Sequence, residues 1–158
     1  MMNVSDSTIL LRPMRDEDIS EVVEIDKISF SLPWSERSYR YDLHSNPSAR
    51  LWVAEIILNG VKKIVGMIVV WLIIDEVHIG TIAVHPSFRR QGIAKKLLSL
   101  AINSLLAEGA KTFTLEVRKG NSEAQALYAQ FGFQVTGVRR RYYQDNGEDA
   151  LIMTLNIA

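Results

Sequence analysis

The segment from Leu51 to Val84 constrains the fold more than any other part of the chain, because it holds three apolar runs separated by very short polar breaks. The longest run, Ile64–Ile74, is too short to span a bilayer, which needs about 20 apolar residues. Its β-branched residues indicate a strand that is buried on both faces. Asn59-Gly60 is a strong hairpin signal, and Asp75-Glu76 breaks the apolar pattern again. The sequence therefore predicts an antiparallel meander of strands Leu51–Leu58, Lys63–Ile74 and Val77–Val84.

The sequence on either side of this meander alternates between helix and strand signals. Before it we expect a short strand, Ile9–Leu11, closed by Pro13. A helix follows that opens with Asp16, Glu17 and Asp18, is stopped by Pro33, and buries Ile19, Val22, Val23 and Phe30. A second, short helix is expected from Ser35 to about His44. After it we expect a long helix from about Gly92 to a C-cap at Gly109, a strand Thr112–Val117, a short helix capped by Asn121 and Ser122, and strands Gln134–Tyr142 and Ala150–Ile157 joined through Asp145-Asn146-Gly147. This order predicts an α/β (α+β) fold, in which a mixed sheet carries helices on both faces.

Length and composition limit the remaining possibilities. The 158 residues are expected to form one domain, 1–158, large enough to bury a core without disulfides. With 0 Cys the chain has no cysteine nucleophile and no thiolate ligand, and we expect no metal site. The 18 basic and 18 acidic residues balance, which argues against a nucleic acid or a membrane as partner. The polar start Met1–Thr8 has no apolar signal-peptide core, so a cytoplasmic location is expected.

The start of the long helix carries the clearest signal for a ligand. In the run Arg89-Arg90-Gln91-Gly92-Ile93-Ala94-Lys95-Lys96 no Ser, Thr, Asp or Asn occupies the capping position, so the first backbone N–H groups lack a side-chain partner. Gly92 leaves room for an anion, and the arginines and lysines flank it. The pattern predicts a pyrophosphate site; the plain alternative is a solvated helix start with basic surface residues. Neither a Gly-Lys-Ser/Thr loop nor a G-x-G-x-x-G motif after a strand is present.

Arg89-x-x-Gly92-x-Ala94, following a strand that ends Ile82-Ala83-Val84, resembles the signature of the GNAT superfamily of N-acetyltransferases. The resemblance covers essentially the whole chain and implies a mixed, mostly antiparallel central sheet of about seven strands with helices on both faces. It also implies acetyl-CoA as cosubstrate, with the pyrophosphate on the N–H groups of this turn and the pantetheine arm beside the preceding strand. The cofactor-binding residues that it implies are Ile82, Ala83, Val84, Arg89, Arg90, Gln91, Gly92, Ile93, Ala94, Lys95, Asn121 and Tyr128.

Several segments narrow the resemblance to enzymes that acetylate protein N-termini. They are similar to the ribosomal-protein alanine N-acetyltransferases and to the catalytic subunits of archaeal and eukaryotic N-terminal acetyltransferases, and the sequence does not separate these groups. The resemblance implies N-terminal peptides as acceptors, a ribosomal protein among them, with Trp34, Tyr142 and Tyr143 beside the peptide. An auxiliary subunit or a second copy of the chain stays open as a partner. The matching segments are Pro33-Trp34-Ser35-Glu36, Leu115-Glu116-Val117-Arg118, Ala126-Leu127-Tyr128, Phe131-Gly132-Phe133, and Arg140-Arg141-Tyr142-Tyr143 with Gly147-Glu148-Asp149-Ala150.

Glu116, His78 and Tyr128 are the candidates for acid–base catalysis. Glu116 lies on a predicted interior strand, where a carboxylate is costly unless it is solvated or paired, so it is either salt-bridged or a general base. His78, whose ordinary pKa is about 6.5, is a second base or a structural residue. Tyr128 either packs into the core or, as the resemblance implies, protonates the departing thiolate. The resemblance also favours Glu116 as the base, and a backbone N–H near Val84 is expected to stabilise the oxyanion.

The pKa of the acceptor amine helps to predict which class of amine the enzyme uses. An α-amino group with a pKa of about 7.8 is roughly 10% neutral at pH 7, whereas a lysine with a pKa of about 10.4 is neutral in roughly 0.1% of molecules or fewer. A mild carboxylate base therefore suits a protein N-terminus better. Two alternatives stay open, namely an acetyltransferase for lysines or small-molecule amines and a non-catalytic CoA-binding subunit.

Overall fold

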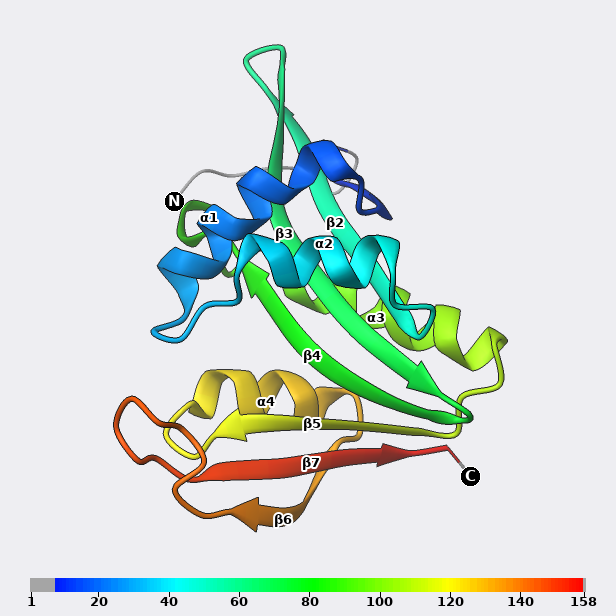
Figure 1. Cartoon of the computed structure of the whole chain (residues 1–158), viewed down its shortest axis with the longest axis vertical. Coiled ribbons are helices and arrows are strands. Elements are labelled where there is room, and N and C mark those ends of the chain that lie inside the picture. Colours follow the sequence, from blue (N-terminus) through cyan, green and yellow to red (C-terminus); the bar gives the residue numbers. More distant parts are fainter. Residues whose placement is uncertain (1–7, 158) are drawn as a thin grey trace.

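The computed structural model describes residues 8–157 and contains a seven-stranded sheet in the order β1-β2-β3-β4-β5-β7-β6 (Figure 1). The strands are β1 Leu10–Pro13, β2 Ala49–Leu58, β3 Val61–Ile73, β4 Glu76–Val84, β5 Thr112–Arg118, β6 Gln134–Arg139 and β7 Ala150–Asn156. The helices are α1 Ile19–Ser29, α2 Glu36–His44, α3 Ile93–Ala107 and α4 Ser122–Gln130, with 3-10 turns at Asp16–Asp18 and Pro86–Phe88. The predicted fold class, a mixed and mostly antiparallel sheet with helices on both faces, is confirmed.

Strands β2, β3 and β4 form the predicted antiparallel meander at the centre of the sheet. Asn59 (φ 52°) and Gly60 (φ 78°) both have positive φ, as a two-residue type I′ hairpin turn requires. Residues 64–70 of β3 are all buried, so the burial on both faces expected of this run is confirmed there. The strand ends at Ile73, one residue earlier than expected, because Ile74 turns left-handed (φ 60°) and is 92% exposed.

β4 and β5 are the neighbouring strands that shape the site. They pair in parallel only where Glu76–His78 meet Thr112–Thr114. Beyond this short ladder the two strands diverge (Figure 1). On its other edge β4 has a β-bulge at Gly80, because Val69 pairs with Thr81 and Val70 with Ile79. The diverging part of the sheet therefore leaves one edge of β4 without a neighbouring strand.

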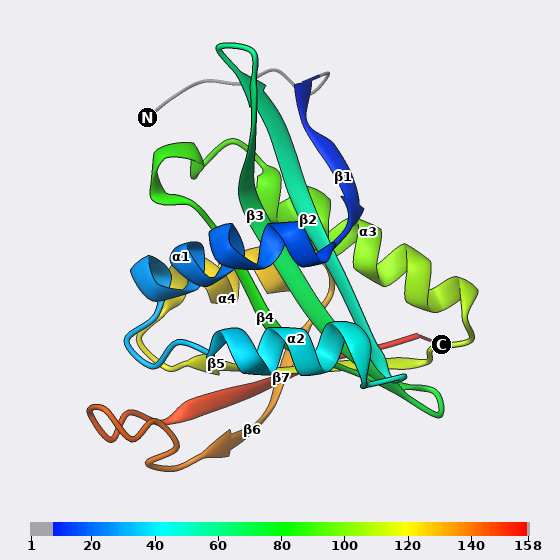
Figure 2. The same cartoon turned by 45° about the horizontal axis from the view of Figure 1, so that its top comes forward.

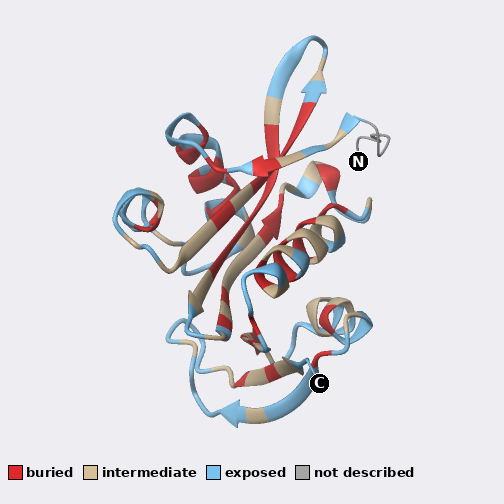
Figure 3. Ribbon diagram, turned by 90° about the vertical axis from the view of Figure 1, so that its right-hand side faces the viewer, coloured by how far each residue is buried: buried red, intermediate tan, exposed pale blue. Residues whose placement is uncertain are grey.

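Two hydrophobic clusters hold the helices against the sheet. The first contains Leu97 and Leu98 of α3 together with Phe113 of β5, and the second contains Val22 of α1 and Tyr39 of α2. α1 and α2 cover one face of the central strands and α3 covers the other (Figure 2). In Figure 3 the buried residues follow the central strands and the helix sides that face them. Among residues 8–157 no helix is long and apolar enough to cross a membrane.

A buried ionic network, which the sequence did not reveal, ties β1 to β2 and to the turn before α1. The Arg12 guanidinium donates hydrogen bonds to Asp18 at 2.7 and 2.8 Å and to Glu55 at 2.5 and 2.8 Å. All three residues are buried. Burial raises the pKa of Asp18, but the bonds from Arg12 and from the Arg15 N–H outweigh it and hold that pKa below its ordinary value. Asp18 therefore serves this network as well as the helix start.

Several element boundaries differ by one or two residues from the sequence-based expectation, and two further differences change the surroundings of the candidate site. β6 ends at Arg139 rather than Tyr142, because residues 140–149 form a loop in which Arg141 takes a left-handed conformation (φ 50°). Phe30 is not an inward-facing residue of the first helix. It is the C-cap residue after α1, has an extended backbone and is 39% exposed. Both differences lengthen loops that border the site.

Candidate active site

α3 begins without a capping side chain, as the sequence predicts. Gly92 is the N-cap residue with φ 80°, and it forms no side-chain capping hydrogen bond. A Cβ built on Gly92 would meet no atom within 4 Å, so the space before the helix is open on the side of the described chain. Arg90 is also left-handed (φ 61°), which turns the loop sharply. An open helix start with a positive dipole end and nearby cations fits a diphosphate group.

A cavity of about 440 Å³ extends from this helix start along the end of β4 to α4, and we call it the α3 cavity. Gln91 was predicted to contact the cofactor but is not among the residues that line it. Asn121 lines it and also caps α4, since its Oδ1 accepts a hydrogen bond from the Ala124 N–H at 3.1 Å. The predicted cofactor-binding residues that do line the cavity are Ile82, Ala83, Val84, Arg89, Arg90, Gly92, Ile93, Ala94, Lys95, Asn121 and Tyr128.

The Arg89 side chain turns back toward the sheet and α1. Its Nε donates to the Val84 carbonyl at 2.9 Å, and Nη2 donates to the Ser29 hydroxyl at 3.2 Å. These bonds join the end of β4 to the last turn of α1. Sequence reasoning placed Arg89 among the cations around a diphosphate, whereas here two of its nitrogen atoms bind the protein itself.

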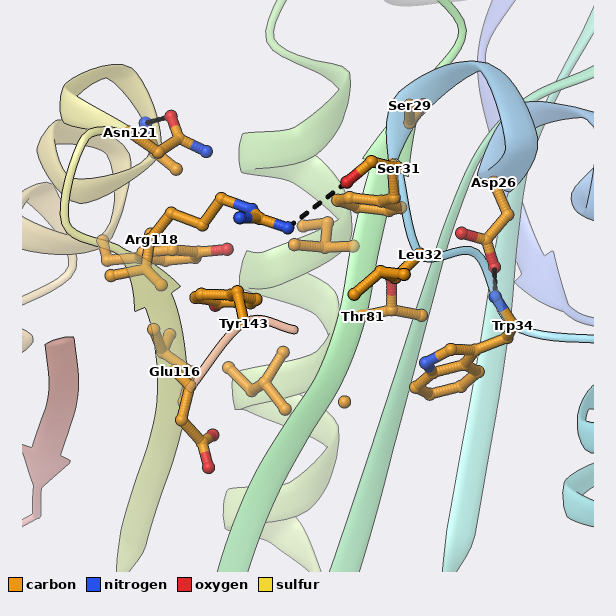
Figure 4. Close-up of a pocket in the computed structure, with 18 residues that line it drawn as sticks. Asp26, Ser29, Ser31, Leu32, Trp34, Thr81, Glu116, Arg118, Asn121 and Tyr143 are labelled. Atoms are coloured by element: carbon orange, nitrogen blue, oxygen red, sulfur yellow. Dashed lines mark hydrogen bonds between the residues drawn. The ribbon is translucent and has the colours of Figure 1, made fainter. Parts of the chain in front are cut away.

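A second cavity, of about 430 Å³, lies between the diverging parts of β4 and β5, and we call it the β4–β5 cavity. Trp34 and Tyr143, two of the predicted acceptor-binding residues, line it (Figure 4). Tyr142 does not line it; its side chain contacts Tyr143 from outside, with ring centroids 5.1 Å apart. The two cavities adjoin, because they share the wall residues Ser29, Phe30, Ile82, Asn121, Ala124 and Tyr128.

Tyr128 stands at this junction. It is 7% exposed and packs against Phe133, with ring centroids 5.9 Å apart, so the packing role considered from the sequence is present. Burial, with a smaller contribution from Tyr143, raises the pKa of Tyr128 above its ordinary value. Within residues 8–157 its hydroxyl group hydrogen-bonds to no other side chain. A protonated phenol at the junction of two cavities can donate a proton to a group that passes between them.

Glu116 and His78 are brought together although they are distant in sequence. His78 Nε2 lies 2.5 Å from Glu116 Oε2, and Arg139 Nε lies 3.6 Å from Glu116 Oε1. The hydrogen bond with His78 lowers the pKa of Glu116 and outweighs the opposite effect of its burial. Glu116 lines the β4–β5 cavity and His78 does not. Glu116 is therefore paired, which is one of the two alternatives weighed from the sequence, and its role as a general base stays a prediction.

Aromatic rings connect this pair to Trp34. The Trp34 ring stacks on Trp71, with centroids 5.6 Å apart and planes 18° apart, and Trp71 lies 5.5 Å from the His78 ring. This packing requires a glycine at position 80, because a Cβ there would lie 2.5 Å from Trp71 and 2.9 Å from Trp34. Ring atoms essentially never approach a Cβ so closely, so only glycine fits without a shift. The Gly80 backbone and the Trp71 ring together hold Trp34 in place in the wall of the β4–β5 cavity.

A polar cluster that the sequence did not reveal closes the far side of the β4–β5 cavity. Arg118 forms ion pairs with Asp145 at 2.9 Å and Glu148 at 3.3 Å, and its guanidinium lies 3.9 Å from the Tyr143 ring centroid. Ser31, in the loop after α1, bonds to both Asp145 and Arg118. Arg118 is two residues beyond Glu116 on the same strand, so the alternation of β5 could have indicated that it shares the Glu116 face.

Asp26 is a further lining residue that sequence reasoning missed (Figure 4). It lies on the inward side of α1 and is 1% exposed. Its spacing from Val22 and Val23 places it on the apolar stripe of that helix, where a carboxylate is unusual. That anomaly was visible in the sequence and indicates a specific partner or a function.

Comparison with known proteins agrees with this geometry. A model of the "Acetyltransferase (GNAT) family" matches residues 19–133. A Bacillus subtilis (strain 168) protein, provisionally named [ribosomal protein bS18]-alanine N-acetyltransferase, is 40% identical over 147 residues, which cover 93% of this chain and 95% of that protein. The crystal structure of the ribosomal-protein-S18-alanine N-acetyltransferase from Escherichia coli superposes with a TM-score of 0.83 at 31% identity, covering 95% of this chain and 94% of that one. A chain of the NatC complex bound to Gag peptide and CoA gives a TM-score of 0.84 at 28% identity, covering 96% and 99%.

Proposed function

This chain belongs to the acetyltransferase (GNAT) family, and we propose that it transfers the acetyl group of acetyl-CoA to the α-amino group of a protein N-terminus. The observation that carries the proposal is the pair of adjoining cavities that meet at Tyr128. One cavity begins at an uncapped helix start suited to a diphosphate, and the other contains a carboxylate and aromatic walls. Transfer of an acetyl group from a CoA thioester to an amine needs one space for each substrate, and the two spaces must meet where the reacting atoms come together.

The residues of the α3 cavity would bind acetyl-CoA. The first-turn N–H groups after Gly92 would hold the diphosphate, helped by Arg90 and Lys95. The edge of β4 at residues 82–84, which lacks a neighbouring strand, offers main-chain hydrogen bonds to the pantetheine arm and to the oxyanion. Arg89 would hold the end of β4 in place through the Val84 carbonyl rather than bind phosphate directly.

Acid and base would act from opposite sides of the junction. Tyr128, kept protonated by its burial, would donate a proton to the leaving thiolate. Glu116, with His78 beside it, would accept a proton from the amine directly or through water. Because the pKa of Glu116 lies below its ordinary value, this base is mild. A mild base suits an α-amine, roughly a tenth of which is already neutral at pH 7, better than a lysine.

The names of the similar enzymes suggest a specific acceptor, the amino-terminal alanine of ribosomal protein bS18. Trp34 and Tyr143 would bind the first residues of that peptide inside the β4–β5 cavity. Tyr142, which lies outside this cavity, would contact later residues of the peptide. We place the reaction in the cytoplasm, where ribosomal proteins are made. A similar chain belongs to the NatC complex, so a partner subunit or a second copy remains part of the proposal.

The test is a competition between amines in one reaction. Acetyl-CoA and the purified chain are incubated with three acceptors: a peptide with the first residues of bS18, the same peptide with a blocked N-terminus and an internal lysine, and a polyamine. Mass spectrometry locates the acetyl group. We expect acetylation of the free N-terminus at a much higher kcat/KM. A preference for the lysine or the polyamine would replace the proposal with the second candidate.

Two variants separate an enzyme from a CoA-binding subunit. Glu116→Gln and Tyr128→Phe should each lower kcat, by roughly 10²- to 10⁴-fold for a lost general base or acid, and leave acetyl-CoA affinity nearly unchanged. Unchanged turnover in both variants would show that catalysis does not use these groups. Sedimentation of the chain with and without the peptide would show whether it acts alone or as a dimer.

A further inference from the structure

Asp26 presents an unused carboxylate oxygen to the β4–β5 cavity. Its Oδ2 accepts hydrogen bonds from the Tyr39 hydroxyl at 2.6 Å and from the Trp34 N–H at 3.2 Å. No residue in the range 8–157 donates a hydrogen bond to Oδ1. In Figure 4 one oxygen of Asp26 meets the Trp34 N–H, and the other is directed away from it, toward the side where Leu32 and Ser31 lie. The residue is 1% exposed, so this oxygen is accessible only from the cavity.

The charges around the cavity leave Asp26 as the carboxylate without a counterion. Among the residues that the structure describes, three charged ones line this cavity, namely Asp26, Glu116 and Arg118. Glu116 is paired with His78, and Arg118 is paired with two acids of the loop after β6. In the part of the chain that the structure describes, no Lys, Arg or His lies within ion-pair distance of Asp26. Buried charges in proteins are normally paired, and an unpaired one is costly. Burial raises the pKa of Asp26, and its two hydrogen bonds oppose that effect.

We propose that Asp26 Oδ1 binds the positively charged amino group of the acceptor, so that the substrate supplies the counterion that the protein lacks. This inference rests on the proposed function and names a residue that recognises its amine. The ligand is a primary ammonium group at a peptide N-terminus. Oδ2 holds Trp34 and Tyr39, and Oδ1 holds the substrate. Asp26 thereby fixes the acceptor and one wall of its cavity at the same time, before Glu116 receives the proton.

The substitution Asp26→Asn separates these two tasks. The Trp34 N–H can only donate, so the amide oxygen of Asn takes the place of Oδ2 and the amide NH₂ takes the place of Oδ1. The wall is kept, while an acceptor atom facing the cavity becomes a donor that opposes an ammonium. Tyr39→Phe is the matched control, because it removes one internal bond to Oδ2 and leaves Oδ1 unchanged.

Binding is measured without turnover, in the complex of each protein with CoA. Two peptides are titrated: one with an N-terminal alanine and one in which that alanine lacks its amino group. We expect the wild-type protein to prefer the amino peptide by roughly ten- to a hundredfold, as for a hydrogen bond to a charged group. Asp26→Asn should lose this preference and Tyr39→Phe should keep it. All three proteins should bind acetyl-CoA equally well.

The outcomes are distinct. If Asp26→Asn keeps the preference for the amino peptide, the inference is wrong even though N-terminal acetylation stands. If the wild-type protein shows no preference, the inference is wrong whatever the variant does, including a failure of the variant to fold. If the wild-type protein acetylates lysines and not N-termini, the proposed function fails. The amine competition identifies that case, and the binding experiment tests Asp26 independently because it needs no transfer.

Discussion

Replacing Gly92 tests the cofactor site most directly, because a second glycine with a similar conformation, Gly109, serves as a control for backbone strain. Gly92 and Gly109 lie just before and just after α3, both with positive φ (80° and 96°), and a Cβ on either would meet nothing within 4 Å. A side chain at either position should therefore impose a similar strain on the fold. Only the Gly92 position lines the α3 cavity.

The expected magnitudes follow from that comparison. A left-handed L-residue costs about 1–2 kcal/mol, partly offset by about 0.4–1 kcal/mol from the restricted unfolded chain. Gly92→Ala and Gly109→Ala should each lower the free energy of unfolding by about 1 kcal/mol. A methyl group that removes one N–H bond to phosphate should weaken acetyl-CoA binding by roughly ten- to a hundredfold in Gly92→Ala alone.

A charge at the same position gives the second comparison. Two unit charges about 5 Å apart repel by about 0.8 kcal/mol in water and about 3.3 kcal/mol at an effective dielectric constant of 20. Gly92→Asp should therefore bind acetyl-CoA more weakly than Gly92→Asn, which has the same shape, by roughly four- to three-hundredfold. The difference should shrink at 1 M salt, where the screening length is about 3 Å.

The assay is calorimetric titration with acetyl-CoA at low and high salt, together with urea unfolding of each variant. Gly109→Ala controls for the strain and should bind acetyl-CoA like the wild-type protein. If Gly92→Asp binds acetyl-CoA as well as Gly109→Ala does, the diphosphate does not lie at the start of α3. The assignment of the α3 cavity would then be withdrawn.

Three further predictions concern stability and packing. Arg12→Met leaves the buried Asp18 and Glu55 without their cation and should lower the free energy of unfolding by about 3–5 kcal/mol, measured by urea denaturation; a loss below 1 kcal/mol would show that the network is solvated. The pKa of Glu116 lies below its ordinary value of 4.5, so its pairing stabilises the fold above about pH 4.5 and this contribution disappears as pH falls through the lowered pKa. The stability difference between the wild-type protein and Glu116→Gln should narrow accordingly in acid; a gap independent of pH would contradict the pairing. Gly80→Ala forces its Cβ against Trp71 and should cost about 1–3 kcal/mol, part of which Trp71→Phe restores in the double variant, whereas simple additivity in that cycle would exclude the clash.

The elements that the sequence predicted well are those whose signals are local. Asn59-Gly60 defines its hairpin because positive φ at two successive residues suits few other pairs. The absence of a capping residue before Ile93 was visible at once, and the structure shows that helix start uncapped. β6 was drawn too long because nothing local marks its end. Its last pairing partner is Ala150, and the loop that follows is held by bonds from Arg118 to Asp145 and from the Gly120 N–H to Glu148.

The candidate site shows the same division. Glu116, His78 and Tyr128 were selected by residue type and resemblance, but the contact between His78 and Glu116 joins positions 38 residues apart. Arg118 and Ser31 are 87 residues apart, and no periodicity indicates such a contact. Arg89 was taken for a phosphate ligand from its position in a motif. The direction of its side chain depends on a carbonyl at the end of β4 and a hydroxyl at the end of α1.

The sequence by itself determined which segments are strands and helices, where the meander turns, and that one helix begins without a cap, since caps, turns and alternation are decided within a few residues of the backbone. Only the tertiary structure decided how charges are compensated. Whether a carboxylate such as Asp26 or Glu116 has a counterion depends on which elements pack against it, and burial makes that partner matter because a charge removed from water must be neutralised nearby. That is why the two carboxylates of the β4–β5 cavity differ in the structure: Glu116 is paired within the protein, and Asp26 faces the cavity without a counterion among the described residues.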